Sequence, residues 1–320
     1  MIKQVVIDRG IPFLDGVFPS EIDVRFLSPE EITSDSVRHA DALFVRTRTK
    51  INKELLHGSN VRFVATATIG FDHIDQDYCR EAGIHWVSCP GCNAQAVCDY
   101  VEEAISSIKF NNSKLTVGVI GYGHIGKLVA RMAEKRGYKV LLSDPPLGIG
   151  LSLEQLAPQC DVLTFHTPLT REGEYPTYHL CDANILRRCK PGTLIINAAR
   201  GGVIDEQALL STLNTKHSTL NYKTAIDCWE NEPNLNQELL KKANLASFHI
   251  AGYSIQGKMN ASEMCLRAFC EFFSLPILSI NKKAVPLQGD SEKGWLLRIT
   301  EQLKANPEQF EQFRKQYKLR

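Results

Sequence analysis

Leu115-Thr-Val-Gly-Val-Ile-Gly121-Tyr-Gly123-His-Ile-Gly126 is the stretch that decides the fold of this 320-residue chain. An apolar run leads into a glycine-rich turn, and the turn opens a helical pattern. Gly121 allows the sharp turn, Gly123 allows the backbone to approach a pyrophosphate, and Gly126 allows the helix to pack closely on the strand. Glycines also mark ordinary turns, but a strand before them and a helix after them favour a dinucleotide site.

Asp144 lies eighteen residues after Gly126, at the end of the next apolar run. A carboxylate at this place accepts hydrogen bonds from ribose hydroxyls and repels a 2′-phosphate, so the sequence predicts NAD rather than NADP. The first residues of the helix, among them His124 and Ile125, present free backbone N–H groups to the phosphates.

The chain around this unit alternates apolar runs with amphipathic stretches, which indicates parallel sheets covered on both faces. Six strands are expected after residue 114, at Leu115–Ile120, Lys139–Leu142, Val162–His166, Thr193–Asn197, Lys223–Ile226 and Leu245–His249. Five are expected before residue 90, at Val5–Asp8, Ile22–Leu27, Ala42–Val45, Arg62–Ala67 and His85–Ser88. We therefore predict an α/β protein with two doubly wound parallel-sheet domains.

The predicted division inserts a Rossmann domain into a flavodoxin-like domain. The NAD-binding domain spans 94–257, and the substrate domain is built from 1–93 and 258–285. The remaining segment, 286–320, is richer in charge and glutamine, and we expect a short C-terminal extension with one or two small helices.

Three titratable or charged residues follow three successive predicted strands of the second series: Arg200, Glu232 and His249. Ligands of open α/β sheets bind outside the carboxyl ends of the strands. A histidine can accept the proton of an alcohol, a glutamate can orient the ring, and an arginine can bind a carboxylate through both of its N–H edges. Singly, each residue suits a structural role, but the set beside a dinucleotide motif predicts the oxidation of a hydroxy acid.

Further polar residues end other predicted strands. Asp227 is placed to hold the nicotinamide carboxamide, and Thr167 is placed to contact the cofactor, whereas His166 suits a structural role. In the first domain, the run 46–50 (Arg-Thr-Arg-Thr-Lys) follows a buried strand and suits an anion such as phosphate. A solvated basic loop is the alternative reading of that run.

Composition narrows the class of protein. The formal net charge is +1, from 37 basic and 36 acidic residues, which gives no reason to expect nucleic acid or a membrane surface as a partner. No apolar run approaches the ~20 residues of a membrane span, and the N-terminus does not have the pattern of a signal peptide. We expect a cytoplasmic protein. Of ten cysteines, Cys89 and Cys92 form a single C-x-x-C; because a second pair is missing, we predict no metal site.

The chain resembles the D-isomer-specific 2-hydroxyacid dehydrogenase family over most of residues 1–275. The motifs that carry the resemblance are Gly121-Tyr-Gly-His-Ile-Gly126, His166-Thr-Pro-Leu-Thr170, Asn197-Ala-Ala-Arg-Gly-Gly-Val-Ile-Asp-Glu206, Asp227-Cys-Trp-Glu-Asn-Glu-Pro233 and His249-Ile-Ala-Gly252. The resemblance implies that Arg200, Glu232 and His249 form a catalytic triad.

The resemblance also implies binding roles for other residues. NAD contacts are implied at Asp144, Thr167, Asp227 and Gly252. Substrate contacts are implied at Thr47, Thr68 and Tyr253, with Arg46 as a candidate for a phosphate, so that the substrate is a small phosphorylated hydroxy acid.

Other readings of the family remain open. One is a dehydrogenase acting on 3-phosphoglycerate or on an unphosphorylated acid, and another is a non-catalytic scaffold that senses NADH. A homodimer is implied, although the members that the chain resembles most usually carry a C-terminal dimerisation domain. Here only about forty residues follow the predicted core.

Overall fold

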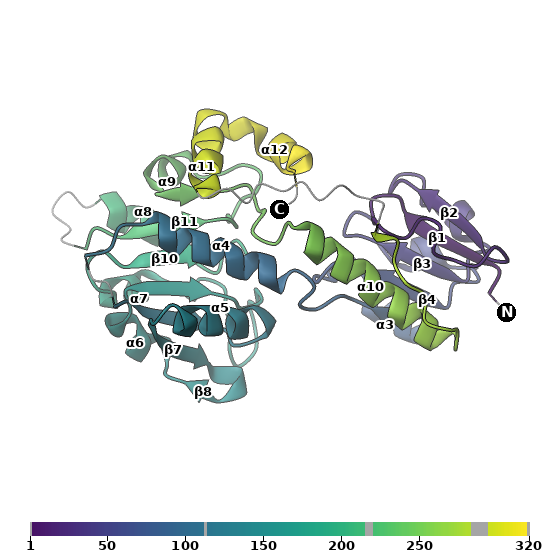
Figure 1. Ribbon diagram of the computed structural model, residues 1–320, viewed down its shortest axis with the longest axis horizontal. Coiled ribbons are helices and arrows are strands. Elements are labelled where there is room, and N and C mark those ends of the chain that lie inside the picture. The colour runs from purple at the N-terminus through teal and green to yellow at the C-terminus, as the bar shows by residue number, and fades with distance from the viewer. Residues whose placement is uncertain (1, 112–113, 215–219, 283–293, 319–320) are drawn as a thin grey trace. The chain divides into compact units, whose positions relative to one another are not determined.

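The structure is a computed structural model that describes residues 2–111, 114–214, 220–282 and 294–318. It divides into two compact units, each described by itself. Unit 1 is built from Met1–Asn93 and Ser254–Gln288, and unit 2 from Ala94–Tyr253 and Gly289–Arg320. Each unit is an α/β body around a mainly parallel sheet, which confirms the predicted fold class (Figure 1). Within the described residues, no helix is long and apolar enough to cross a bilayer.

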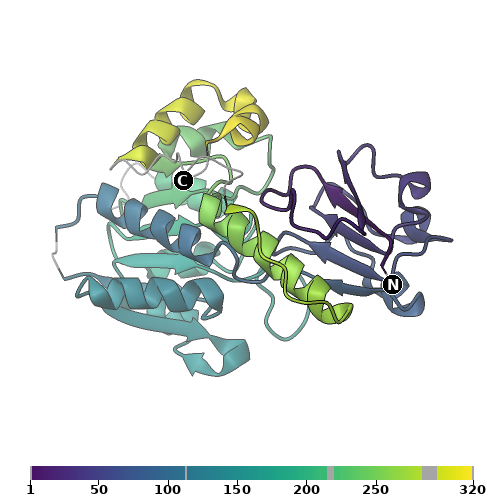
Figure 2. The same ribbon diagram turned by 45° about the vertical axis from the view of Figure 1, so that its right-hand side comes forward.

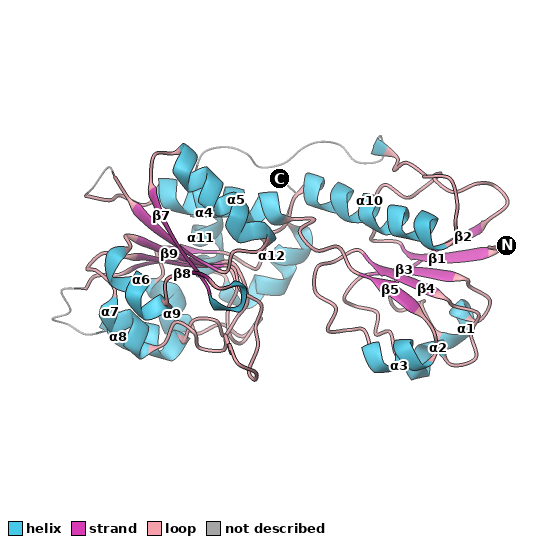
Figure 3. Ribbon diagram, turned by 90° about the horizontal axis from the view of Figure 1, so that it is seen from below, coloured by secondary structure: helices cyan, strands magenta, loops and turns pink. Residues whose placement is uncertain are grey.

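Unit 1 has a five-stranded parallel sheet in the order β2-β1-β3-β4-β5. Its strands are β1 Gln4–Asp8, β2 Asp23–Leu27, β3 Ala42–Val45, β4 Phe63–Thr66 and β5 His85–Val87. Its helices are α1 Ser34–Val37, α2 Lys53–Leu56, α3 Gln76–Glu81 and α10 Ile255–Phe272. Figure 3 shows α10 on one face of this sheet and the three short helices on the other.

The apolar faces of β3, β4 and α10 form the core on one side of this sheet. Every residue of β3 and β4 is buried, as expected for strands covered on both faces. The Phe269 ring of α10 lies 5.5 Å from Phe44 and 6.0 Å from Phe63 between ring centroids. These aromatic contacts explain why α10, which comes 160 residues and more after the strands, docks on them.

Unit 2 has a seven-stranded sheet in the order β12-β11-β10-β9-β6-β7-β8. Its strands are β6 Thr116–Ile120, β7 Lys139–Asp144, β8 Ile149–Gly150, β9 Val162–Phe165, β10 Leu194–Asn197, β11 Lys223–Ile226 and β12 Leu245–Ala246. All neighbours are parallel except β7 and β8. The six predicted strands are present. The additional strand β8 was not predicted, because it has only two residues, one of them a glycine, and these give no strand pattern.

Helices cover both faces of the unit 2 sheet. They are α4 Ala94–Ser107, α5 His124–Lys135, α6 Leu153–Leu156, α7 Ala183–Arg188, α8 Glu206–Asn214, α9 Gln237–Lys242, α11 Trp295–Ala305 and α12 Phe310–Gln316, with short 3₁₀ turns at η1 Pro145–Leu147, η2 Ala157–Gln159 and η4 Pro307–Gln309. In Figure 3, α4, α5 and α11 lie on one face and α6 to α9 on the other.

The C-terminal helices are part of unit 2. Leu296, Leu303 and Phe310 are completely buried in its hydrophobic core. Thr300 of α11 accepts a hydrogen bond from the backbone N–H of Ala246 in β12 at 2.9 Å, so α11 continues the packing at the β12 edge (Figure 2). The segment expected as an extension therefore supplies core residues.

Candidate active site

The glycine-rich turn between β6 and α5 forms the cradle that the sequence predicts. A Cβ at Gly126 would lie 1.9 Å from the carbonyl oxygen of Gly121, so only glycine lets α5 approach the strand. A Cβ at Gly123 would meet nothing within 4 Å, which leaves open space beside the backbone. Gly123 is also the N-cap residue of the twelve-residue α5. Because glycine has no side chain to accept a hydrogen bond, the first backbone N–H groups of the helix, at His124 and Ile125, have no side-chain cap at this position.

Asp144 closes the far side of this cradle at the end of β7. Its Oδ2 accepts a hydrogen bond from the N–H of Tyr122 at 2.6 Å, and its Oδ1 accepts one from the N–H of Leu147 at 3.3 Å. The carboxylate therefore ties the glycine-rich turn to the end of β7. Each oxygen keeps a further lone pair, as needed for ribose hydroxyls.

Thr167 and His166 follow β9, beside the glycine-rich turn. A Cβ at Gly121 would lie 2.8 Å from the His166 carbonyl, which shows how closely the two segments approach. The Thr167 hydroxyl is buried and makes no hydrogen bond within the described residues. Burial lowers the pKa of His166 to about 3, so its ring is neutral, and its Nε2 lies 3.0 Å from the Thr164 hydroxyl. The structure thus leaves both the Thr167 hydroxyl and Nδ1 of His166 buried without a hydrogen-bond partner among the described residues.

Glu232 and His249 meet beyond the carboxyl ends of β11 and β12. Nδ1 of His249 lies 2.8 Å from Oε2 of Glu232 and 3.1 Å from Oε1. Glu232 Oε1 also accepts a hydrogen bond from the backbone N–H of Trp229 at 2.9 Å, which holds the carboxylate in place. The carboxylate of Glu232 therefore engages Nδ1 of His249 and not Nε2.

Asp227, at the end of β11, holds the backbone that carries His249. Its carboxylate accepts hydrogen bonds from the N–H groups of Ile250 at 2.8 Å and Ala251 at 2.9 Å, and from the Ser247 hydroxyl at 2.7 Å. His249 has a φ of +58°, a left-handed conformation that is costly for a histidine. These bonds fix the turn that continues into Gly252, and Asp227 itself is 1% exposed.

Cys228 is a neighbour of this pair that the sequence analysis did not single out. A ligand-type atom of each of Cys228, Glu232 and His249 lies within 4.8 Å of the others. Cys228 and then Glu232 favour the protonated ring and outweigh burial, so the pKa of His249 is raised above its ordinary value. Burial raises the pKa of the Cys228 thiol. No sequence pattern signals this contact, since a small buried cysteine after a strand is common.

Arg200 lies on the neighbouring turn, after β10. The side-chain amide of Asn197 donates hydrogen bonds to the carbonyls of Arg200 at 2.9 Å and Cys228 at 3.0 Å, so it joins the two turns. A Cβ at Gly201 would lie 1.9 Å from the Trp229 carbonyl, which makes glycine necessary at this close approach. The Arg200 side chain is exposed, and its guanidinium donates to its neighbour's carbonyl.

The predicted substrate residues of unit 1 lie at the ends of β3 and β4. Arg46 forms a two-pronged ion pair with the buried Asp8, at 2.9 Å for each N–H···O contact. Thr47 is exposed, and the Thr68 hydroxyl bonds to the Thr66 hydroxyl at 2.7 Å. The electrostatic field of Arg46 also reaches Lys258 on α10; burial and then Arg46 lower the pKa of that lysine. Lys258 was not among the predicted substrate residues, because it lies more than 200 residues after Arg46 in the sequence.

Tyr253, the fourth predicted substrate residue, belongs to unit 2. Its backbone N–H donates to the carbonyl of Ile250 at 2.8 Å, which continues the turn after His249. Its hydroxyl accepts a hydrogen bond from Nε of Arg314 at 3.1 Å. The sequence analysis gave no role to Arg314, which lies in the C-terminal helix α12.

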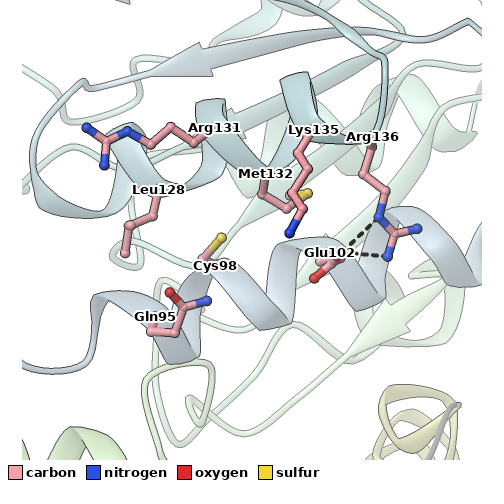
Figure 4. A pocket seen from close by; sticks show the side chains of 8 residues that line it. All are labelled: Gln95, Cys98, Glu102, Leu128, Arg131, Met132, Lys135 and Arg136. Carbon is pink, nitrogen blue, oxygen red and sulfur yellow. Dashed lines mark hydrogen bonds and ion pairs between the residues drawn. The ribbon is translucent and has the colours of Figure 1, made fainter.

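A pocket of about 420 Å³ lies between α4 and α5 (Figure 4). Charged side chains line much of it, and an ion pair of Arg136 with Glu102 crosses its edge. It follows the sides of two helices and includes none of the predicted site residues, so we do not assign the cofactor to it.

The two cysteines of the C-x-x-C are buried in unit 1. Cys89 Sγ lies 3.4 Å from Cys265 Sγ, and burial raises the pKa of Cys92 to about 12. Such thiols are poor metal ligands and poor nucleophiles in the protonated form. In the described residues, the clusters with metal-ligand character are the His249 group and His179 with Asp205 and Glu230; His179 Nε2 lies 2.8 Å from Glu230 Oε1.

Comparison with known proteins adds to this geometry. Residues 99–251 match the family model of the D-isomer specific 2-hydroxyacid dehydrogenase NAD binding domain. Among solved structures, the fold is similar to an NAD⁺-bound 3-phosphoglycerate dehydrogenase of Entamoeba histolytica, with a TM-score of 0.70, 24% identity and coverage of 86% of this chain and 96% of that one. D-2-hydroxyisocaproate dehydrogenase gives a TM-score of 0.69 at 21% identity, over 85% of this chain and 97% of that one.

The chain belongs to the D-isomer-specific 2-hydroxyacid dehydrogenase family, and it is an NAD-dependent dehydrogenase. Within that family, it is 40% identical to an erythronate-4-phosphate dehydrogenase of Bacteroides thetaiotaomicron, over 99% of this chain and 96% of that protein. It is also 40% identical to one of Pseudomonas fluorescens, over 92% of this chain and 81% of that protein.

The residues in place fit NAD. The space beside Gly123, the uncapped start of α5 and the unpartnered Thr167 hydroxyl provide contacts for a pyrophosphate and its neighbours. Asp144 would provide the carboxylate for the adenosine ribose. When bound, NAD⁺ supplies the hydride acceptor of the reaction.

Proposed function

We propose that this protein oxidises the 2-hydroxyl of 4-phospho-D-erythronate with NAD⁺. The product is (R)-3-hydroxy-2-oxo-4-phosphooxybutanoate, and the step belongs to the biosynthesis of pyridoxal phosphate. The observation that carries the chemistry is the contact of 2.8 Å between His249 Nδ1 and Glu232 Oε2, in the unit that binds NAD.

His249 acts as the general base in this proposal. The hydroxyl proton of the substrate passes to Nε2 of His249, and bound NAD⁺ would accept the hydride from the carbinol carbon, so that the alcohol becomes a ketone. Glu232 keeps Nδ1 protonated and stabilises the imidazolium that results. Arg200 binds the substrate carboxylate and polarises the oxygen of the forming carbonyl.

The choice of substrate rests on two kinds of support. Relatives that are named erythronate-4-phosphate dehydrogenase are 39–41% identical to this chain and cover at least 85% of it. In unit 1, Arg46 pairs with the buried carboxylate of Asp8, and the charge of Arg46 acts on the nearby Lys258, so two cations are available to a phosphate beside one carboxylate. We assign Arg46, Thr47, Thr68 and Tyr253 to substrate binding on this basis.

The test is a direct assay of purified protein. NADH formation is followed by absorbance with 4-phospho-D-erythronate, 3-phosphoglycerate and unphosphorylated D-erythronate, each with NAD⁺ and with NADP⁺. We expect the highest kcat/KM for 4-phospho-D-erythronate with NAD⁺. Turnover of the unphosphorylated acid at an equal kcat/KM would reject the assignment, and failure to oxidise any hydroxy acid would favour the scaffold reading.

We further propose a cytoplasmic homodimer. Light scattering coupled to size-exclusion chromatography measures the oligomeric state; a mass of one chain, 35.9 kDa, at assay concentrations would contradict the dimer.

A further inference from the structure

The C-terminal helix α12 is docked beside the turn that carries His249. Phe248, one residue before the histidine, is buried and packs against two aromatic rings of the C-terminal segment. Its ring centroid lies 5.7 Å from that of Phe313 and 5.9 Å from that of Tyr317. Packing of this kind fixes the height and rotation of α12 on unit 2.

This docking presents Arg314 to Tyr253. Nε of Arg314 donates to the Tyr253 hydroxyl oxygen at 3.1 Å, and its guanidinium carbon lies 5.9 Å from the centre of the Tyr253 ring. Nη1 of Arg314 donates to Oε1 of Glu311 at 3.4 Å, one turn earlier on the same helix, so the guanidinium has two hydrogen-bond partners. The Arg314 side chain is 29% exposed. Its charge also interacts with Glu232.

We propose that Arg314 is a positioning residue of the active site, which sets the Tyr253 hydroxyl to donate its proton to an anionic oxygen of the substrate. This inference rests on the proposed function, because it takes Tyr253 as a substrate-binding residue. It assigns a role to the C-terminal helix that the family match, which ends at residue 251, does not cover.

The chemistry follows from the hydrogen-bonding capacity of a phenol. A tyrosine hydroxyl has one proton to donate and lone pairs with which to accept. The N–H of Arg314 occupies a lone pair, and an arginine has no acceptor to take the phenol proton. The Tyr253 proton is therefore directed to another acceptor, and the adjacent positive charge makes the phenol a stronger donor. A carboxylate or phosphate oxygen is the acceptor that such a donor binds best.

The test compares Arg314→Met with Lys315→Met, a matched loss of charge at the next, exposed position of α12. With 4-phospho-D-erythronate, we expect Arg314→Met to raise KM about tenfold and to change kcat less, since the lost contact holds the substrate and transfers neither the proton nor the hydride of the reaction. Lys315→Met leaves KM unchanged. The Kd of NADH, measured by fluorescence titration, is expected to be the same in both variants, because Arg314 acts on substrate.

A double-mutant cycle separates positioning from general packing. In a Tyr253→Phe background, Arg314→Met is expected to raise KM less than about twofold, because the phenol through which it acts is missing. If Arg314→Met does not fold, Arg314→Lys in the same cycle serves instead. An unchanged KM in Arg314→Met, or an effect that persists in full without the Tyr253 hydroxyl, overturns the inference. If wild-type protein oxidises no hydroxy acid, the proposed function fails instead, and the two failures are thus distinct.

Discussion

The protonation of His249 is the residue-scale property that governs the direction of the reaction. Cys228 and Glu232 raise its pKa above the ordinary value. Oxidation needs the neutral ring as base, so we expect kcat/KM for oxidation to rise with pH through an apparent pKa above ~6.5, the ordinary value of histidine. Reduction of the 2-oxo acid needs the imidazolium, and its rate is expected to fall over the same range. Both pH profiles can be measured from NADH absorbance.

Glu232→Gln provides the check on this prediction. The amide has no charge with which to favour the imidazolium, so the rise of kcat/KM with pH is expected to move to lower pH. We also expect kcat to fall ~10²-fold or more, as for other residues that orient a catalytic histidine. If kcat/KM of Glu232→Gln rises over the same pH range as that of the wild type, the group that titrates is not His249.

At the same scale, the sequence predicts the candidate reactive residues but not the residues that support them. Arg200, Glu232 and His249 follow strand ends, and strand ends of a parallel sheet are where reactive side chains collect. Asn197, which joins the Arg200 and Cys228 turns, and Cys228 itself have no such signature. Their roles depend on contacts between turns, which spacing along the chain does not encode.

At the scale of elements, the strands were the most predictable part of the fold. The runs of β3, β9 and β10 are apolar or nearly so and are buried throughout, which gives a clear sequence signal. β8 was not predicted, because it has only two residues. They pair antiparallel with β7 after the chain reverses direction at η1. β12 ends earlier than predicted, at Ala246, since Ser247 turns its hydroxyl to Asp227.

The start of α8 and the turn before Glu232 are joined by two glutamates. The N–H of Glu230 donates to Oε1 of Glu206 at 2.8 Å, and the N–H of Glu206 donates to Oε1 of Glu230 at 3.2 Å. Burial, and to a lesser degree the nearby Glu230 and Glu232 carboxylates, raise the pKa of Glu206 to about 7. A carboxyl whose folded pKa is above its unfolded value costs stability as pH rises from ~4.5 through 7.

We therefore expect Glu206→Gln to be more stable than wild type at pH 8.5, by up to roughly 3 kcal/mol, and close to it at pH 5. The amide oxygen can still accept the Glu230 N–H, so the connection between the two elements is retained. Urea unfolding at the two pH values measures the difference. Glu301→Gln, at an exposed position of α11, is the control; equal effects of Glu206→Gln at both pH values would contradict the raised pKa.

At the scale of the molecule, the two-domain α/β organisation follows from the sequence, but the place of the C-terminal segment does not. Few aliphatic residues and many charges made 286–320 look like an appendage. In the structure, five apolar residues of its described part are buried in the core of unit 2: Trp295, Leu296, Ile299, Leu303 and Phe310. A sparse apolar pattern on a short helix does not reveal which sheet it covers, because its partners, such as β12 and α4, are distant in the chain.

A chain that ends at residue 288 tests this placement. Burial of a large apolar side chain contributes ~1.5–3 kcal/mol, so loss of five of them removes on the order of 10 kcal/mol, comparable with the ~5–15 kcal/mol that stabilises a whole protein. The truncated chain is expected to lose the cooperative unfolding transition of unit 2 in calorimetry and to lose NADH binding. The matched control is Leu297→Ser, an exposed position on α11. Because unit 1 keeps its own sheet and α10, its transition is expected to survive truncation; a truncated chain that binds NADH with wild-type affinity would show instead that α11 and α12 are dispensable to the core.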